Sequence, residues 1–170
     1  MIFELLGRKA PKKLIEFFLD NPTGKFYERE IQKKTKLSKM SVNKWLKKLV
    51  EVGLIIRIRQ GRLNIHQLNQ INPIVKVLKI FKIIDSVYPH LRRIGNTQIF
   101  LYGSAAIGEY NEKSDIDVLV IGNDRKIIEN IRKINEKIKV SFYTPLEWSQ
   151  TARKDPAFFE QVEKQKIRLV

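Results

Sequence analysis

The 170-residue sequence contains no cysteine and only two histidines. The first absence excludes disulfides, thiolate zinc sites and iron–sulfur clusters, and it favours a reducing compartment. His66 and His90 have no second ligand at the spacing of a metal site. No apolar run approaches the roughly 18 residues that span a bilayer, and the first six residues are too short for a signal peptide. We therefore expect a cytoplasmic protein without a membrane segment.

Acidic residues are also scarce, and their scarcity is local. The chain has 33 Lys and Arg but 18 Asp and Glu, for a net charge of +15. Residues 1–95 hold 21 basic and 7 acidic residues, whereas residues 96–170 hold 12 and 11. Such a one-sided charge favours a polyanionic partner, because neutralised phosphates release their counterions. A lysine-rich surface also serves solubility, and composition alone does not separate the two roles.

Three helices are predicted in the first 52 residues. The first begins near Pro11 and ends before the turn at residues 20–24. The second covers residues 27–34, and the third covers residues 39–52 with apolar residues at helical spacing. Ser38 is a good N-cap for the third helix, which has Lys39, Ser41, Asn43, Lys44, Lys47 and Lys48 on its predicted polar face.

A basic hairpin is predicted directly after these helices. Residues 54–59 and 62–68 alternate apolar and polar positions around a tight turn at Gln60 and Gly61. The order of helices and hairpin resembles the winged helix-turn-helix family, which places a helix in the major groove of double-stranded DNA and a wing on the backbone. The resemblance implies these DNA-binding residues: Lys39, Ser41, Asn43, Lys44, Lys47, Arg57, Arg59 and Arg62.

A further helix is predicted over residues 73–93 and would link two domains. Its apolar stripe comprises Ile74, Val77, Leu78, Phe81, Ile84 and Val87. The stripe could pack on either domain or pair with a second copy, and a homodimer is common among winged-helix regulators. We predict a two-domain α+β chain with a DNA-binding domain at 1–70, a linker helix at 71–95 and a small α/β domain with a mixed sheet at 96–170.

Two linked motifs mark the second domain. A strand at residues 99–102 precedes Gly103 and Ser104, and a second strand carries Asp115 and Asp117. Because strand side chains alternate, the two aspartates project from one face, where they could hold Mg²⁺. The glycine would allow close approach of a phosphate, and the serine hydroxyl could donate to a triphosphate. The ordinary alternative is a plain strand-to-helix turn and a strand that ends at the surface.

These motifs, within residues 97–143, resemble the minimal nucleotidyltransferase domain of the DNA polymerase beta superfamily. The resemblance implies a catalytic and metal-binding role for Asp115 and Asp117 and a nucleotide-binding role for Gly103 and Ser104, with Mg²⁺ and an NTP as cofactor and ligand. Two positions depart from the family pattern. Ile107 stands where active members have an arginine, and the strand at 138–143 offers Lys139 and Ser141 where they have a third carboxylate. A lysine there would repel a metal ion and could pair with either aspartate.

The sequence leaves two main functions open, beside a basic structural module without a DNA role. The leading hypothesis is a DNA-binding protein similar to transcriptional regulators, with a nucleotidyltransferase-like domain that has lost catalysis. The alternative is an active Mg²⁺-dependent enzyme that transfers a nucleoside monophosphate from an NTP to a hydroxyl of a protein, an RNA or a small molecule. Similar small domains form one half of toxin–antitoxin pairs, so this alternative also implies a helical protein partner.

Overall fold

The computed structural model describes residues 2–95 and 97–170. The chain divides into two compact units, Met1–Lys76 and Val77–Val170. Helix α5 (Pro73–Leu91) runs across this boundary, and the predicted domain limits at residues 1 and 96 fall outside the described residues. None of the helices in the described ranges is long and apolar enough to cross a membrane.

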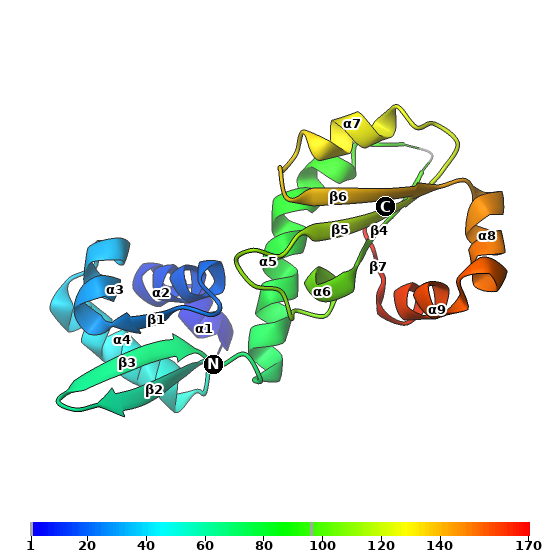
Figure 1. Ribbon diagram of the computed structural model, residues 1–170. Coiled ribbons are helices and arrows are strands. Elements are labelled where there is room, and N and C mark those ends of the chain that lie inside the picture. Colours follow the sequence, from blue (N-terminus) through cyan, green and yellow to red (C-terminus); the bar gives the residue numbers. More distant parts are fainter. Residues whose placement is uncertain (1, 96) are drawn as a thin grey trace. The chain divides into compact units, whose positions relative to one another are not determined.

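The N-terminal unit combines four helices with a three-stranded antiparallel sheet in its described residues (Figure 1). The sheet order is β1-β3-β2. The predicted helices correspond to α2, α3 and α4, and the predicted hairpin corresponds to β2 and β3. The elements are α1 (Ile2–Leu6), α2 (Lys9–Asp20), β1 (Lys25–Tyr27), α3 (Glu28–Thr35), α4 (Lys39–Glu51), β2 (Ile55–Gln60) and β3 (Leu63–Leu68).

Local signals set the limits of these elements. Lys36 adopts a left-handed conformation with φ of 54° just after α3. The Ser38 hydroxyl then accepts a hydrogen bond from the Ser41 N–H at 3.2 Å, which caps α4. In the hairpin, Gln60 pairs with Leu63 around a two-residue loop whose first residue, Gly61, has φ of +59°. A glycine there is typical of a type II′ turn, which matches the twist of the two strands.

Apolar side chains from three helices fill the core of this unit. Phe18 is fully buried and packs edge-on against Phe17 at 5.2 Å and against Phe26 at 6.2 Å between ring centroids. Burying each such side chain stabilises the fold by roughly 1.5–3 kcal/mol. The other buried residues from these helices include Leu14, Ile15, Ile31, Val42, Leu46 and Leu49. They fix the orientation of α4, and so decide which of its side chains reach solvent.

The C-terminal unit is built on a four-stranded mixed sheet with the order β6-β5-β4-β7. β5 and β6 are parallel, whereas β4 is antiparallel to both β5 and β7. A mixed sheet in this half is what the sequence predicts. Besides α5, the elements are β4 (Gln98–Tyr102), α6 (Gly103–Ala106), β5 (Ile116–Ile121), α7 (Ile127–Arg132), β6 (Ile138–Tyr143), α8 (Pro145–Lys154), α9 (Pro156–Gln165) and β7 (Ile167–Arg168).

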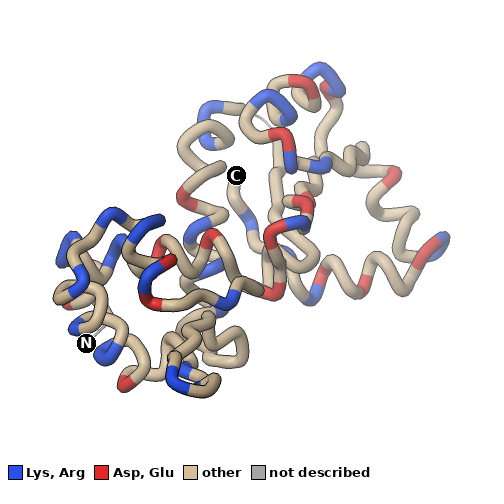
Figure 2. The backbone as a smooth tube through the Cα atoms, turned by 60° about the vertical axis from the view of Figure 1, so that its left-hand side comes forward, with Lys and Arg blue, Asp and Glu red and all other residues tan. Residues whose placement is uncertain are grey.

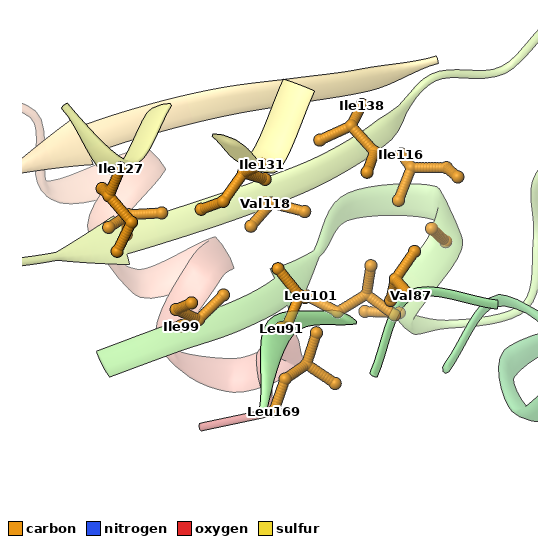
Figure 3. Packing of buried hydrophobic residues seen from close by; sticks show 13 residues of the cluster. Val87, Leu91, Ile99, Leu101, Ile116, Val118, Ile127, Ile131, Ile138 and Leu169 are labelled. Carbon is orange, nitrogen blue, oxygen red and sulfur yellow. The ribbon is translucent and has the colours of Figure 1, made fainter. Parts of the chain in front are cut away.

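Different helices cover the two faces of this sheet. On one face, α5 and α7 supply Leu91 and Ile131 to a cluster that includes Val118, as Figure 3 shows. On the other face, α8 and α9 pack Trp148 and Phe158 against the sheet. Because β5 alternates, its aspartate must lie on the face opposite Val118.

Helix α5 carries apolar residues on more than one side. Val87 and Leu91 are fully buried in the core of the C-terminal unit. By contrast, Val77 and Phe81 from the predicted stripe are 63% and 61% exposed. The stripe therefore splits into a buried part and an exposed part, and pairing of the exposed part with a second copy stays a prediction.

Candidate functional site

The turn after β4 brings Gly103 against Asp117. Gly103 has φ of +67°, in the left-handed region that disfavours residues with a side chain. A Cβ atom at this position would lie 2.7 Å from Asp117 Oδ2. Ser104 follows at the start of α6, is half-buried, and accepts a hydrogen bond from the Glu109 N–H through its carbonyl oxygen. The two sequence motifs thus meet in space.

A row of three polar residues crosses the sheet at this point. Asp117 of β5 pairs in register with Tyr102 of β4 and with Lys139 of β6. Asp115 lies two residues before Asp117, just ahead of β5. The Lys139 Nζ lies 2.6 Å from Asp115 Oδ2. The predicted pairing of a lysine with one of the aspartates is confirmed, and Lys139 is the residue beside Asp117 on the neighbouring strand.

Ser141, the second inward candidate on β6, has a different partner. Its hydroxyl oxygen lies 2.9 Å from the Tyr102 hydroxyl, and this hydrogen bond reaches across β5. The Tyr102 ring also packs edge-on against Phe158 of α9, with 6.1 Å between centroids. These contacts hold the phenol beside the aspartates and join the polar row to the aromatic cluster under α8 and α9.

Burial and charge set the electrostatics of the site. Burial raises the pKa of the Asp117 carboxyl, the neighbouring Asp115 raises it further, and Lys139 opposes both effects. The hydrogen bond to Asp115 raises the pKa of the Lys139 ammonium. Burial also raises the pKa of the Tyr102 phenol. The site therefore contains two close carboxylates whose repulsion is relieved by one ammonium group.

A family comparison covers this whole arrangement. The family described as "Nucleotidyltransferase domain" matches residues 77–167, more than half of the chain. The match includes the glycine–serine turn and both aspartates. The chain belongs to the nucleotidyltransferase domain family. The mixed sheet of the C-terminal unit is thus the sheet of a nucleotidyltransferase domain.

Two of the solved structures similar to this nucleotidyltransferase-domain chain come from archaea. One is a possible transcriptional regulator from Methanosarcina mazei Go1, with 20% identity and a TM-score of 0.39, covering 56% of this chain and 86% of its own. Another is a candidate nucleotidyltransferase from Sulfolobus solfataricus, with 17% identity and a TM-score of 0.33, covering 55% of this chain and 81% of its own. The curated proteins gave no match.

Nucleotidyltransferase domains typically use Mg²⁺ and an NTP. Whether this site can hold Mg²⁺ depends on the oxygen ligands that its side chains offer. A two-metal centre requires several hard oxygen ligands that bridge both ions. Here Asp115 is engaged by Lys139, and the register position next to Asp117 carries an ammonium. In the described ranges, no group of three or more His, Cys, Asp or Glu could hold a metal ion. The residues present do not fit a two-metal centre.

The predicted DNA-binding residues lie on α4 and on the β2–β3 hairpin of the N-terminal unit. Six of them are exposed: Lys39, Lys44, Lys47, Arg57, Arg59 and Arg62. Ser41 and Asn43 are half-buried, and Asn43 Oδ1 is buried without a hydrogen-bond partner. Asn43 follows the buried Val42, so it lies about 100° around the helix from the core, on the flank of α4 rather than on its outer face.

Two aromatic residues near these sites carry no motif in the sequence. Tyr102 reaches the aspartates only because β4 pairs in register with β5. In the N-terminal unit, the Trp45 ring lies 5.3 Å from Lys44 Nζ and 5.7 Å from the Arg8 guanidinium carbon. These three side chains line a cleft of about 340 Å³ between α1 and α4. The position of Tyr102 follows only from the register of β4 and β5, and no sequence signal joins Arg8 to Trp45.

Proposed function

We propose that this nucleotidyltransferase-domain protein binds double-stranded DNA through a winged helix-turn-helix at residues 1–70, as a transcriptional regulator does, and does not carry out Mg²⁺-dependent nucleotidyl transfer. The observation that carries the DNA-binding role is the order α2-β1-α3-α4-β2-β3 with exposed basic side chains on α4 and on the hairpin. In that family the second helix of the motif enters the major groove.

The connection between α3 and α4 supports this assignment. Only residues 36–38 separate the two helices, and the left-handed Lys36 turns the chain sharply before the Ser38 cap. The exposed Lys39, Lys44 and Lys47 lie along α4 from its first residue onward. A helix that has backbone N–H groups available at its start and exposed lysines along its length is suited to binding phosphates and base edges in a DNA groove.

The hairpin supports the role of a wing. Arg57 and Arg59 are two residues apart on β2, so they project from the same face of the strand. Arg62 lies in the turn, and all three are exposed. Arginines along one strand and in the turn of a short hairpin can contact the phosphate backbone or the minor groove beside the helix.

The charge of the N-terminal unit agrees with a phosphate-binding surface. Residues 1–76 contain 17 Lys and Arg and 6 Asp and Glu. Figure 2 shows Lys and Arg at many positions along this part of the chain. If about six phosphates are contacted, the logarithm of the binding constant should fall with the logarithm of the salt concentration at a slope of about −5.

Fluorescence anisotropy with labelled duplex DNA tests the proposal. Affinity is measured between 50 and 200 mM salt, a range over which phosphate contacts weaken binding by orders of magnitude. The variants K44E/K47E and R57E/R59E should each lower affinity at least about ten-fold and flatten the salt slope. The matched control is R132E/K133E, which makes the same charge change on exposed residues of the other unit. A flat salt response in the wild type, or equal losses in all three variants, contradicts the proposal.

A second experiment tests the absence of transfer. The alternative function draws on Gly103, Ser104, Asp115 and Asp117, which lie close together, yet the donor set does not fit a two-metal centre. Purified protein is incubated with each α-labelled NTP, Mg²⁺ and a cell extract of protein, RNA and small molecules. No labelled product should form beyond the level given by Asp115→Asn. A product that the wild type forms and Asp115→Asn does not would establish the alternative.

A further inference from the structure

We propose that the Lys139 ammonium is the resident cation of the aspartate site, and that it excludes divalent metal ions from Asp115 and Asp117. This inference deepens the proposal that the nucleotidyltransferase domain does not use a metal, and it is independent of DNA binding. It makes Lys139 the residue that decides which cation this site accepts.

Strand register places Lys139 where it can act on both carboxylates. Lys139 is paired with Asp117 across the parallel strands β5 and β6, so both side chains leave the same face of the sheet. Its Nζ also bonds Asp115 at 2.6 Å. One ammonium group thus lies against the two carboxylates that would be the protein ligands of a metal ion.

The net negative charge around the site is too small to balance a divalent metal ion. The titratable groups that interact here are Asp115, Asp117, Lys139 and the phenols of Tyr102 and Tyr143. With both aspartates ionised, Lys139 cancels one of the two negative charges. A divalent ion that bound both aspartates would then stand beside an ammonium of the same sign, or would have to displace it from Asp115. Mg²⁺ also gives up its waters reluctantly, so a weakly negative site holds it poorly.

Because Lys139 is exposed, its ammonium could move aside and leave metal binding unaffected, which would contradict the inference. Its side chain is 68% exposed and flexible, and exposed ion pairs hold their partners weakly. If the ammonium simply swings away, a metal ion will bind the wild type despite it. The proposal therefore requires that removing the ammonium changes metal affinity, and that replacing it with a carboxylate changes it further.

Titration of the full chain with Mn²⁺, followed by the electron paramagnetic resonance signal of the free ion, tests this point. Mn²⁺ takes the same oxygen ligands as Mg²⁺ and is directly visible. Lys139→Asp should bind one Mn²⁺ at least about ten-fold more tightly than the wild type, with Lys139→Met between them. Adding Asp115→Asn to Lys139→Asp should abolish the gain. Trp148 fluorescence in a Trp45→Phe background verifies that each variant keeps its fold, and Lys139→Met preserves the test if the aspartate variant fails to fold.

Lys133→Asp is the matched control, because it makes the same charge change on an exposed residue that follows α7. The α7 helix packs on the sheet face opposite Asp117, so the control should leave Mn²⁺ affinity unchanged. Wild type that binds Mn²⁺ as tightly as Lys139→Asp overturns the inference, and so does Mn²⁺ binding that Lys139 variants do not improve. Anisotropy on the same samples reports DNA binding separately, since Lys139→Asp should leave it unchanged.

Discussion

Gly103 and Asp117 approach each other so closely that a Cβ atom at position 103 would lie 2.7 Å from Asp117 Oδ2. The same glycine has a φ of +67°, which costs other residues about 1–2 kcal/mol. A side chain here would therefore strain the backbone and push the carboxylate out of place. Both the conformation of the turn and the position of Asp117 require that residue 103 has no side chain.

Gly103→Ala should lower the free energy of unfolding of the C-terminal unit by about 1–3 kcal/mol. Backbone strain supplies most of the loss, because the carboxylate end of Asp117 can rotate away. The measurement is urea unfolding followed by Trp148 fluorescence in a Trp45→Phe background, since each unit has one tryptophan. Gly95→Ala is the control, because a Cβ there meets no atom within 4 Å. Equal losses in the two variants would contradict this explanation.

The raised pKa of Asp117 predicts how the stability of the same unit depends on pH. Burial raises this pKa above its ordinary value of 3.8, so the folded unit binds the proton more tightly than the unfolded chain. The resulting stabilisation is complete below 3.8 and is lost as pH rises through the folded pKa. Asp117→Asn removes the ionised form, so it should be more stable than the wild type at pH 7 and lose this advantage toward pH 3.

Urea unfolding of wild type and Asp117→Asn at several pH values, again followed by Trp148, measures this difference. Asp85→Asn, which removes an exposed carboxyl on α5, is the control for the loss of an acidic residue. A stability difference between wild type and Asp117→Asn that stays constant from pH 3 to pH 7 would show that burial does not penalise the Asp117 charge.

His66 predicts the opposite pH dependence in the N-terminal unit. Its side chain is 2% exposed, and Nδ1 is buried without a hydrogen-bond partner. Burial lowers its pKa below 6.5, Glu28 opposes this effect, and Arg57 adds to it. A lowered pKa gives stability that is present above 6.5 and lost as pH falls through the folded pKa. The unit should therefore be less stable at pH 5 than at pH 7.5.

The measurement for His66 is a urea series followed by two-dimensional NMR, read from the amide peaks of β3. His66→Phe keeps a flat ring of similar size and cannot be protonated, so it should flatten the dependence of unfolding on pH between 5 and 7.5. If the variant keeps the slope of the wild type, the pH dependence arises from another group.

The longer elements of the fold could be predicted from the sequence, whereas the shortest could not. Helical spacing predicts α2, α4 and α5, alternation predicts the hairpin, and apolar, strand-favouring composition predicts the strands β4, β5 and β6. The three residues of β1 and the two of β7 are too few for any periodicity. They are strands because they pair with β3 and β4, and long-range pairing of this kind leaves no local signal.

The site shows the same division between local and distant information. Alternation along β6 predicts that Lys139 faces the aspartates, and the structure confirms its ion pair with Asp115. The hydrogen bond between Tyr102 and Ser141 depends on the order of three strands, which the sequence does not give. The polar side chain of Asn43 predicts a position among the exposed donors of α4. Its place beside Val42 puts it on the flank of the helix instead, with its amide oxygen buried.

Removal of the Ser38 cap should loosen the first turn of α4, the helix that we propose enters the DNA groove. The Ser38 hydroxyl accepts the Ser41 N–H at 3.2 Å, and this N–H has no partner within the first turn of the helix. Ser38→Ala should destabilise the helix by about 1 kcal/mol, whereas Ser38→Asn keeps a capping oxygen and should cost little.

Native-state amide exchange of residues 41–45 measures the effect. The alanine variant should exchange several-fold faster at these amides than the wild type and the asparagine variant, and its DNA affinity should fall in parallel if α4 is the helix that enters the groove. Unchanged exchange in Ser38→Ala would mean that packing of Val42 and Leu46 alone holds the first turns of α4.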